Sequence, residues 1–522
     1  MEAEVFEIVD VALRNKVKLA KLPVRYFSGI ERVVWSVWNY IVGPELKFVW
    51  EVVAGDLETY RTCPPAANEC SAESSDCVES ENVLEATSAR LSSASTSLAL
   101  GEVEHNFRSA NECPLEIGLD VAEGNIRQEQ LYNGEDDDRY IAMHTLCSEI
   151  YNPRNSSDVE LKVLRLPDRR FAVGAYIFMA KHQDRQAIHS IALVLNEKRV
   201  DWFLKLQPFL QPFFEDFVTK LRIAILVDKS EELLSRMTSE LNYLLLVLGI
   251  LERRSFAAVN FDIADTHFAE PNSHTNDFLA RCVSAHLQCQ CHTVVVGNNS
   301  KPVNRMLKTL AFVTYRNLWP MSRFMYPESQ ALESDFEFLA VNEPFCPQLF
   351  LQGCSKVNID SIMKQALYSR WPFCVIDVDE HTVFHSLPWR KHDALRKEML
   401  LRDARKILMQ DLPTRRLKIE LKAHSVDDSI VIPFLNQMDQ LPYQNVIRTG
   451  FSLQFLNSLA MRALALDVYA RVESDEGADR SKLSEKSICR ALDIKLKGDF
   501  WIAIAVADLM RPKLAEYLLK SR

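Results

Sequence analysis

The chain has 522 residues, of which 48% are hydrophobic and 25% are charged, so its composition is that of a globular protein of roughly three or four domains. Its net charge of −10 comes from one segment, since Cys63–Asp138 holds 17 acidic and 3 basic residues and leaves 54 acidic and 58 basic residues elsewhere. This near-neutral remainder argues against a dedicated nucleic-acid-binding protein.

The sequence predicts neither a membrane span nor an export signal. The start, MEAEVFEIVD, is acidic and lacks the basic residues and small-residue cleavage site of a secretory signal. The longest run without Asp, Glu, Lys or Arg, Cys282–Ser300, is too polar for lipid, and the apolar run Tyr243–Leu251 is too short to cross it. We therefore expect the 12 cysteines to be reduced thiols in the cytosol or nucleus.

The first predicted elements are two β-branched, aromatic strands, Glu31–Val42 and Leu46–Val53, joined by the turn signal Gly43-Pro44. The next segment, Cys63–Asp138, is poor in aromatic residues and rich in Ser, Glu, Ala and Asn. Such a composition cannot bury enough apolar surface to offset its ordering entropy. We predict that this segment is a disordered acidic insertion.

After the insertion, strands and then helices are predicted. The predicted strands are Val159–Leu166, Phe171–Phe178 and Ile188–Leu195, and the helices are Leu206–Leu221, with apolar residues at three- and four-residue spacing, and Lys229–Arg253. One sheet, split by the insertion and closed by helices, is the simplest assembly of these pieces.

The middle third alternates between helices and strands, and the last part is mostly helical. The middle elements are Asn276–Leu287, His292–Gly297, Lys301–Phe312, Gln348–Gly353 and Phe373–Asp379. The later helices are Asp393–Met409, Phe451–Val472 and Phe500–Leu519, with Pro512 as a break. The alternation predicts an α/β fold with partly parallel strands.

The strand–loop–helix Val294–Leu307 lies where a phosphate loop would be, with Lys301 near the helix N-terminus. A Walker loop needs further glycines and a terminal Gly-Lys-Ser/Thr, and this turn has only Gly297. The residues favour an ordinary turn.

Three residues, Cys289, Cys291 and His292, are potential zinc ligands or members of a hydrolase site. Zinc-binding cysteines are usually separated by two to four residues, and here the side chains alternate across a helix-to-strand switch. Cysteine is also a common core residue. A zinc or cysteine hydrolase is thus a hypothesis that the spacing supports poorly.

Other polar patterns also favour structural roles. Ser361 and Lys364 match S-x-x-K without its companion motifs, and Ser452 lacks the second glycine of a nucleophile elbow. Asp377 and Asp379 would share one face of a strand and could hold a cation only with further ligands. The basic stretch Arg390–Lys418 could meet an acidic protein surface or a membrane, but a solvated helix face is favoured. We predict no catalytic, cofactor-binding or metal-binding residue, and hence a protein that binds other proteins.

The stretch Phe261–Phe312 resembles the chromosome-9 open-reading-frame-72 family, DENN-module proteins linked to amyotrophic lateral sclerosis and frontotemporal dementia. The shared details are Ile263-Ala-Asp-Thr266, Ser284-Ala-His-Leu-Gln288, a cysteine before the Val-Val-Val-Gly strand, and Val303-Asn304. Further stretches resemble the family in the same order. They are Trp38–Pro44 with Trp50, His144–Leu146 with Glu149-Ile150, Ile376–Asp379 with Thr382-Val383, Leu492–Leu496, Gly498-Asp499 and Arg511-Pro512.

The resemblance implies four parts. They are an N-terminal extension (1–29), a longin or upstream DENN module (30–254) containing the insertion (63–138), a central DENN module (255–412) and a helical lobe (413–522). The extension and the insertion depart from the family, and so does the chain's end soon after Pro512, where the family has a further tail.

For function, the resemblance implies a guanine-nucleotide exchange factor for Rab or Arf GTPases that acts in autophagy and in endosomal and lysosomal trafficking. The alternative is a non-catalytic scaffold whose partner supplies GTPase-activating activity. The implied partners are a second DENN protein of the Smith-Magenis chromosome-region type and a WD-repeat protein. The implied location is the cytoplasm, with peripheral association with endosomes, lysosomes and autophagosomes, and also the nucleus.

Overall fold

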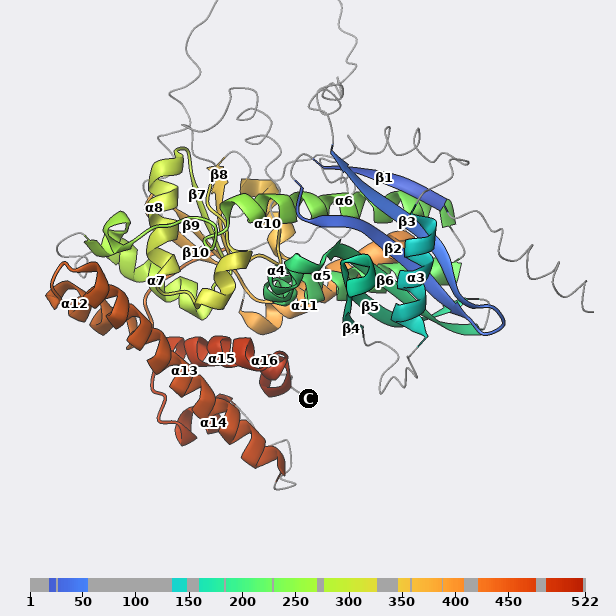
Figure 1. Ribbon diagram of the computed structural model, residues 1–522. Helices are drawn as coiled ribbons and strands as arrows, with labels where there is room; N and C mark the ends of the chain where they lie inside the picture. The colour runs from blue at the N-terminus through green and yellow to red at the C-terminus, as the bar shows by residue number, and fades with distance from the viewer. Residues whose placement is uncertain are drawn as a thin grey trace, which may run out of the picture.

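The computed structural model describes residues 18–24, 27–54, 134–147, 159–182, 185–227, 230–269, 277–325, 346–356, 359–386, 388–407, 421–475 and 485–519 (Figure 1). The strands are β1 (Lys18–Val24), β2 (Ile30–Asn39), β3 (Gly43–Ala54), β4 (Glu160–Leu166), β5 (Phe171–His182), β6 (Arg185–Asn196), β7 (Thr293–Gly297), β8 (Leu351–Ser355), β9 (Cys374–Asp377), β10 (Thr382–His385) and β11 (Lys422–Ala423). The helices are α3 (Glu135–Leu146), α4 (Val200–Lys205), α5 (Gln207–Val227), α6 (Ser230–Arg254), α7 (Asp277–Gln288), α8 (Ser300–Ala311), α10 (Ile359–Ala366), α11 (Trp389–Ile407), α12 (Val431–Gln440), α13 (Asn445–Asp475), α14 (Glu485–Ala491), α15 (Lys497–Met510) and α16 (Leu514–Leu519). Short 3-10 turns are η4 (Pro167–Arg169), η5 (Glu197–Arg199), η6 (Ile263–Asp265), η7 (His267–Ala269) and η9 (Arg316–Met321).

The first α/β unit, from β1 to α6, is built on a six-stranded sheet in the order β1-β3-β2-β6-β5-β4. Helix α3 covers one face, where Ile141 packs with Val34 and Val173. Helices α5 and α6 cover the other face, where Phe214 and Leu241 are fully buried. Figure 1 shows this sheet between its helix layers, so the predicted single sheet closed by helices is confirmed.

Strand β1 lies in the segment that the sequence assigned to an N-terminal extension. It pairs in parallel with β3, and Leu22 and Val24 point into the core while Lys21 stays exposed. This alternation fits an edge strand with one buried face, and Pro23 is tolerated there because an edge leaves one row of N–H groups unpaired. The sheet therefore has an edge strand that the sequence pattern did not predict.

The predicted insertion extends too far toward the C-terminus. Its last four residues, Glu135–Asp138, form the first turn of α3, where carboxylates are favoured by the helix dipole. Asp138 is fully buried and pairs with Arg32 Nε of β2 at 2.9 Å. A residue predicted to lie in the disordered acidic insertion is thus a buried ion-pair partner, and residues 63–133 of the insertion lie outside the described residues.

The second α/β unit, from η6 to β11, has a five-stranded sheet in the order β11-β10-β9-β7-β8. β7 is parallel to both β8 and β9, and β10 and β11 are antiparallel, so the predicted partly parallel sheet is confirmed. Helices α7 and α8 pack on one face, and α10 packs on the other through Ile362 and Met363. Strand β11 comes from the segment that the sequence placed in the helical lobe, but it extends this central sheet.

The helical lobe, α12 to α16, shares one hydrophobic core with the second unit. Leu435, Leu466 and Ile504 belong to the same buried cluster as Val295 of β7. The predicted helix near the end is broken as expected, since α15 ends at Met510 and α16 begins at Leu514 around Pro512, which cannot continue a helix. The lobe is thus packed on the central sheet.

Among the described helices, one stretch is long and apolar enough to span a membrane by length and composition. It is Leu234–Arg254 of α6, with a mean hydropathy of 1.2, and 56% of it is buried inside the molecule. The sequence did not predict this stretch as a candidate. Because α6 packs against β1 and α5, a core helix explains its composition.

Candidate functional site

The turn between β7 and α8 uses its backbone N–H groups within the chain. Asn299 caps α8 by accepting from Lys301 N at 2.9 Å, and the Asp379 carboxylate accepts from Asn298 N at 2.8 Å. A phosphate loop would offer these groups to a ligand. Here an aspartate side chain takes one of them and an asparagine cap takes another.

The side chains of Cys289, Cys291 and His292 point to different places. Gln290 and Cys291 adopt left-handed φ values of 54° and 65°, which turn the chain sharply between α7 and β7. Cys289 is buried in the core of the second unit, whereas Cys291 is buried in the core of the first. His292 lies 3.1 Å from the Leu349 carbonyl oxygen through Nδ1 and stacks on Phe350.

Burial sets the protonation of this group. Burial raises the pKa of the Cys291 thiol to about 12 and lowers the pKa of His292 to about 4, so both are neutral at neutral pH. The pKa of Cys289 is raised well above its usual value by its hydrogen bond with Cys374 and by burial. Within the described residues, no group of three or more His, Cys, Asp or Glu side chains is arranged to hold a metal ion.

The prediction that Asp377 and Asp379 share a strand face is wrong, because β9 ends at Asp377. Asp377 Oδ1 accepts from the backbone N–H groups of Asp379 and Glu380, and its Oδ2 pairs with Lys356 Nζ at 3.0 Å. The carboxylate of Asp377 therefore closes the turn before β10.

The two predicted serine motifs lie on helices. Ser361 and Lys364 are three positions apart on α10, as expected for a helix. Ser452 is buried on α13, and its hydroxyl donates to the Phe312 carbonyl oxygen. This hydrogen bond joins the helical lobe to the second unit.

A buried series of hydrogen-bonded side chains crosses the second unit, and the sequence did not predict it. Cys289 Sγ lies 3.8 Å from His385 Nδ1, and His385 Nε2 contacts His424 Nδ1. His424 Nε2 lies 3.0 Å from Ser284 Oγ, which donates to Asp428 Oδ2 at 2.5 Å. Burial lowers the pKa of His385 to about 4 and that of His424 to about 3, so both imidazoles are neutral at neutral pH.

This series of side chains connects the helical lobe to the second unit. Asp428 Oδ1 accepts from the backbone N–H groups of Ile430 and Val431, the first donors of α12. Ser284 donates to Asp428 and is fully buried, so it is not activated by a histidine as a nucleophile would be. Sequence spacing gave no signal for this cluster because its members come from separate parts of the chain: α7 and the turn after it, β10, and the segment between β11 and α12.

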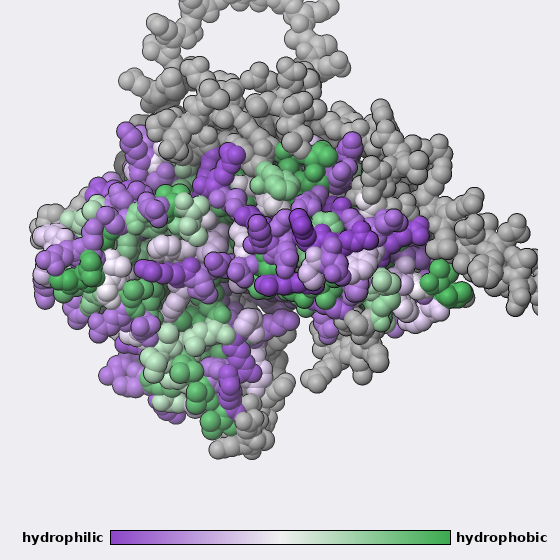
Figure 2. Space-filling view, in the orientation of Figure 1, coloured by the Kyte–Doolittle hydropathy of each residue, from purple (hydrophilic) through white to green (hydrophobic). Residues whose placement is uncertain are grey.

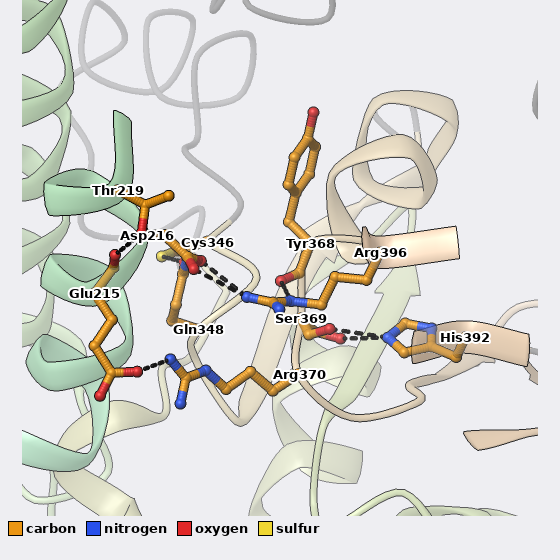
Figure 3. Close-up of polar contacts among 10 residues, drawn as sticks. All are labelled: Glu215, Asp216, Thr219, Cys346, Gln348, Tyr368, Ser369, Arg370, His392 and Arg396. Carbon is orange, nitrogen blue, oxygen red and sulfur yellow. Dashed lines mark hydrogen bonds and ion pairs between the residues drawn. The ribbon is translucent and has the colours of Figure 1, made fainter. Parts of the chain in front are cut away.

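Charged and hydrogen-bonded side chains join the two α/β units at the junction drawn in Figure 3. Glu215 and Asp216 of α5 face basic side chains of the second unit. Arg370 Nη2 donates to Glu215 at 2.5 Å, and Arg396 Nη2 donates to both oxygens of Asp216 at 3.1 and 3.0 Å. Arg396 Nε also donates to the Tyr368 carbonyl oxygen at 3.0 Å. Side chains from three elements therefore fix α5 against α11.

Electrostatics reinforce this junction. Burial alone would raise the pKa of Glu215, but Arg370, with smaller contributions from Gln211 and Lys513, outweighs burial, and the pKa is lowered. Burial alone would lower the pKa of Lys220, one turn further along α5, but Glu240 of α6 at 2.8 Å, together with Asp403 and Asp216, outweighs burial, and the pKa is raised. Both groups stay charged near neutral pH, so Glu215 keeps its ion pair with Arg370 across the junction and Lys220 keeps its ion pair within the first unit.

The predicted basic stretch contributes one residue to this junction. Within α11, Lys397 pairs with Asp393 and Arg402 pairs with Glu398, as expected for a solvated helix face. Arg396 instead points at the first unit and is 12% exposed. Residues after 407, up to 420, lie outside the described part of the chain.

Comparison with known proteins finds sequence similarity to one protein family. The sequence model of the C9orf72-like protein family matches residues 140–392. The chain is 24% identical over 431 residues to "Guanine nucleotide exchange factor C9orf72" of Homo sapiens, which covers 75% of this chain and 86% of that protein. It is also 24% identical over 418 residues to the homologues of Mus musculus and Rattus norvegicus, which covers 73% of this chain and 84% of each of them.

The chain is a divergent homologue of these proteins.

The part matched by the C9orf72-like family model runs from α3 to the start of α11. It therefore contains three of the six strands of the first sheet (β4 to β6), four of the five strands of the second (β7 to β10), and the junction residues Glu215, Asp216 and Arg370. Arg396 lies four residues beyond the matched range. The resemblance noted in Phe261–Phe312 falls on η6, α7, β7 and α8, which form the centre of the second unit.

Proposed function

We propose that this C9orf72-like chain is a DENN-type regulator of small GTPases of the Rab class. Its activity would be guanine-nucleotide exchange, in autophagy and in endosomal and lysosomal trafficking. The observation that carries the proposal is its similarity, over 75% of the chain, to a relative named as a guanine nucleotide exchange factor. The family-model match includes parts of both α/β units, so the similarity is not confined to one motif.

The chemistry of the described residues is compatible with exchange. An exchange factor breaks no covalent bond; it accelerates release by binding the nucleotide-free GTPase more tightly than the loaded one. The candidate catalytic side chains Asp377, Asp379 and Ser452 all make hydrogen bonds within the chain. The protein would thus act by presenting a rigid surface, which the ion pairs of the junction help to fix.

The test is release of fluorescent GDP from a panel of Rab GTPases by the purified full chain. We expect release to accelerate at least tenfold for one or more Rabs, a change of about 1.4 kcal/mol in barrier height. No acceleration with any Rab refutes exchange by this chain alone.

The second candidate is a scaffold that binds a second DENN protein, with a WD-repeat protein in the same complex. The tip of the β2–β3 hairpin favours it, because Tyr40, Ile41 and Val42 are 72%, 89% and 43% exposed. An apolar tip of this kind is typical of a protein interface. The complex would be cytoplasmic and would associate peripherally with endosomes and lysosomes.

The scaffold candidate is tested by co-purification at native expression level. A second DENN protein in equal amount supports it, and we expect Ile41→Asp to release that partner. Leu204→Asp on α4 is the matched control, since Leu204 is 45% exposed and lies away from the hairpin. Equal retention of the partner by both variants would contradict a role for the hairpin tip.

A further inference from the structure

Helix α13 presents a second apolar face, opposite the face that packs in the core. Its inner face buries Phe455, Leu459 and Leu466. The outer face carries eight exposed residues that are apolar or glycine apart from one asparagine: Val446, Gly450, Leu453, Asn457, Met461, Leu464, Val468 and Val472. We call these eight residues the outer stripe. Exposed Gln454 and Arg471 lie at the edges of this face. Figure 2 shows apolar side chains gathered over the lobe that contains α13.

The spacing of the outer stripe matches a straight helix. The pattern repeats after 11 positions, from Val446 to Asn457 and from Leu453 to Leu464. Such a repeat keeps the stripe close to parallel with the helix axis. From Val446 to Val472 it spans about 39 Å, at the usual rise per residue of an α-helix. Val446, Met461 and Val468 are 84%, 65% and 50% exposed, so no element among the described residues covers the stripe.

Gly450 is an independent sign that something approaches this face closely. A glycine inside a helix weakens it, and a packing neighbour usually explains its presence. A Cβ added at Gly450 would meet no atom within 4 Å, so no described residue needs the space. Close approach by another molecule would use it.

The charges of α13 allow a second copy of this chain as the partner. The outer stripe contains no charged residue. Of the nearby charges, Asp467 pairs with Arg471 at 2.6 Å and with Arg511 at 3.0 Å, and Arg448 is buried. Two copies of this face can therefore meet without placing like charges of the stripe opposite each other.

We propose that the outer stripe of α13 binds the outer stripe of a second copy of this chain, antiparallel, about a two-fold axis at Asn457. This register is self-complementary. It places Val446 opposite Val468, Leu453 opposite Met461, and Asn457 opposite Asn457. A lone polar residue in an apolar stripe selects the register in which it hydrogen-bonds to its own copy, and an amide can both donate and accept.

The same register explains Gly450. It lies opposite Leu464 of the second copy, so the large side chain of one helix enters the space left by the glycine of the other. An isologous contact of this kind closes on itself and yields a dimer. The inference concerns α13 alone and is independent of the exchange activity proposed above.

The experiment is sedimentation equilibrium of the purified full chain over a concentration series. We expect a monomer–dimer equilibrium for the natural sequence. Asn457→Asp and Asn457→Lys each place like charges at the axis, and each should weaken dimerisation at least tenfold. An equimolar mixture of the two variants should restore it, because a carboxylate then faces an ammonium group. Only a two-fold contact at this position predicts that rescue.

Gly450→Ala supplies a variant for which misfolding cannot explain the loss. Alanine favours the helix and meets no atom within the chain, so the thermal midpoint of unfolding should rise while dimerisation weakens. Arg462→Ala, an exposed change on α13 outside the stripe, is the control and should leave dimerisation unchanged. A monomer at every concentration, dimers insensitive to both Asn457 variants, or failure of the mixture to restore association each overturns the proposal. Recruitment of the monomer to phosphatidylcholine–phosphatidylserine vesicles, lost in Asn457→Asp, would assign the stripe to lipid and overturn it as well.

Discussion

Replacing Arg396 with methionine tests whether the junction fixes the two α/β units. Methionine keeps the apolar stem and removes the guanidinium group, which donates to both oxygens of Asp216 and to the Tyr368 carbonyl oxygen. The side chains of Arg396 and Asp216 are only 12% and 21% exposed. The variant therefore leaves a mostly buried carboxylate without its partner.

The expected cost follows from that burial. Removing one partner of a fully buried pair costs about 3–5 kcal/mol. Because Asp216 keeps some access to water, which replaces part of the lost hydrogen bonding, we expect a loss of about 2–3 kcal/mol in the free energy of unfolding. Arg402→Met is the matched control on the same helix. Its pair with Glu398 is more exposed, and we expect it to cost about 0.5 kcal/mol or less.

The assay is urea unfolding followed by circular dichroism, arranged as a double-mutant cycle with Asp216→Asn. We expect a coupling energy of about 1–2 kcal/mol between the two positions. Hydrogen exchange at the amides of α5 and α11 reports the same junction locally, and protection there should fall in Arg396→Met. Additivity of the two substitutions within about 0.5 kcal/mol would refute a direct link between the units at this pair.

Three further outcomes are expected. Gly174→Ala would place a Cβ 2.0 Å from Phe203 Cζ, so we expect the free energy of unfolding, measured by thermal denaturation, to fall by about 1–3 kcal/mol. Adding Phe203→Leu should restore part of this stability, and an unchanged free energy of unfolding in Gly174→Ala would contradict the close packing. Burial lowers the pKa of His286 to about 3, so below about pH 6.5 the unfolded chain binds a proton that the folded chain does not, and stability falls as pH falls. His286→Gln should reduce the slope of unfolding free energy against pH by about one proton, or about 1.4 kcal/mol per pH unit, between pH 6 and 4, and an unchanged slope counts against a neutral buried imidazole. A thiol reagent at neutral pH should label exposed Cys147 quickly and leave Cys291 unlabelled until urea is added, because Cys291 is buried and burial raises the pKa of its thiol. Rapid labelling of Cys291 in the folded chain would instead support the cysteine-hydrolase hypothesis.

Local patterns determined much of the secondary structure. The β-branched strands around Gly43, the apolar spacing of α5, the Asn299 cap and the break at Pro512 all follow from interactions within a few residues of the chain. These signals predicted two α/β sheets and a helical end, because a helix or strand must bury one face whichever partner it meets. The family resemblance also followed from short stretches quoted in order along the chain.

Other features depended on contacts between distant segments. Asp138 and Arg32 are separated by the acidic segment, so neither position alone shows that the carboxylate is buried. Strand β1 is short and ends in Pro23-Val24, and only pairing with β3 makes it a strand. The hydrogen-bonded series of side chains from Cys289 to Asp428 joins separate parts of the chain, and no local spacing brings them together.

For the junction between the two units, the sequence and the tertiary structure also contribute different information. The sequence by itself determined that Arg396 lies on a basic helix and that Glu215 and Asp216 lie on an amphipathic one, because charge and period are local properties. Only the tertiary structure decided that these helices meet, since the packing of two separate sheets sets which faces oppose each other. For α13, the sequence supplied two apolar faces, and only the fold showed which of them the core leaves exposed.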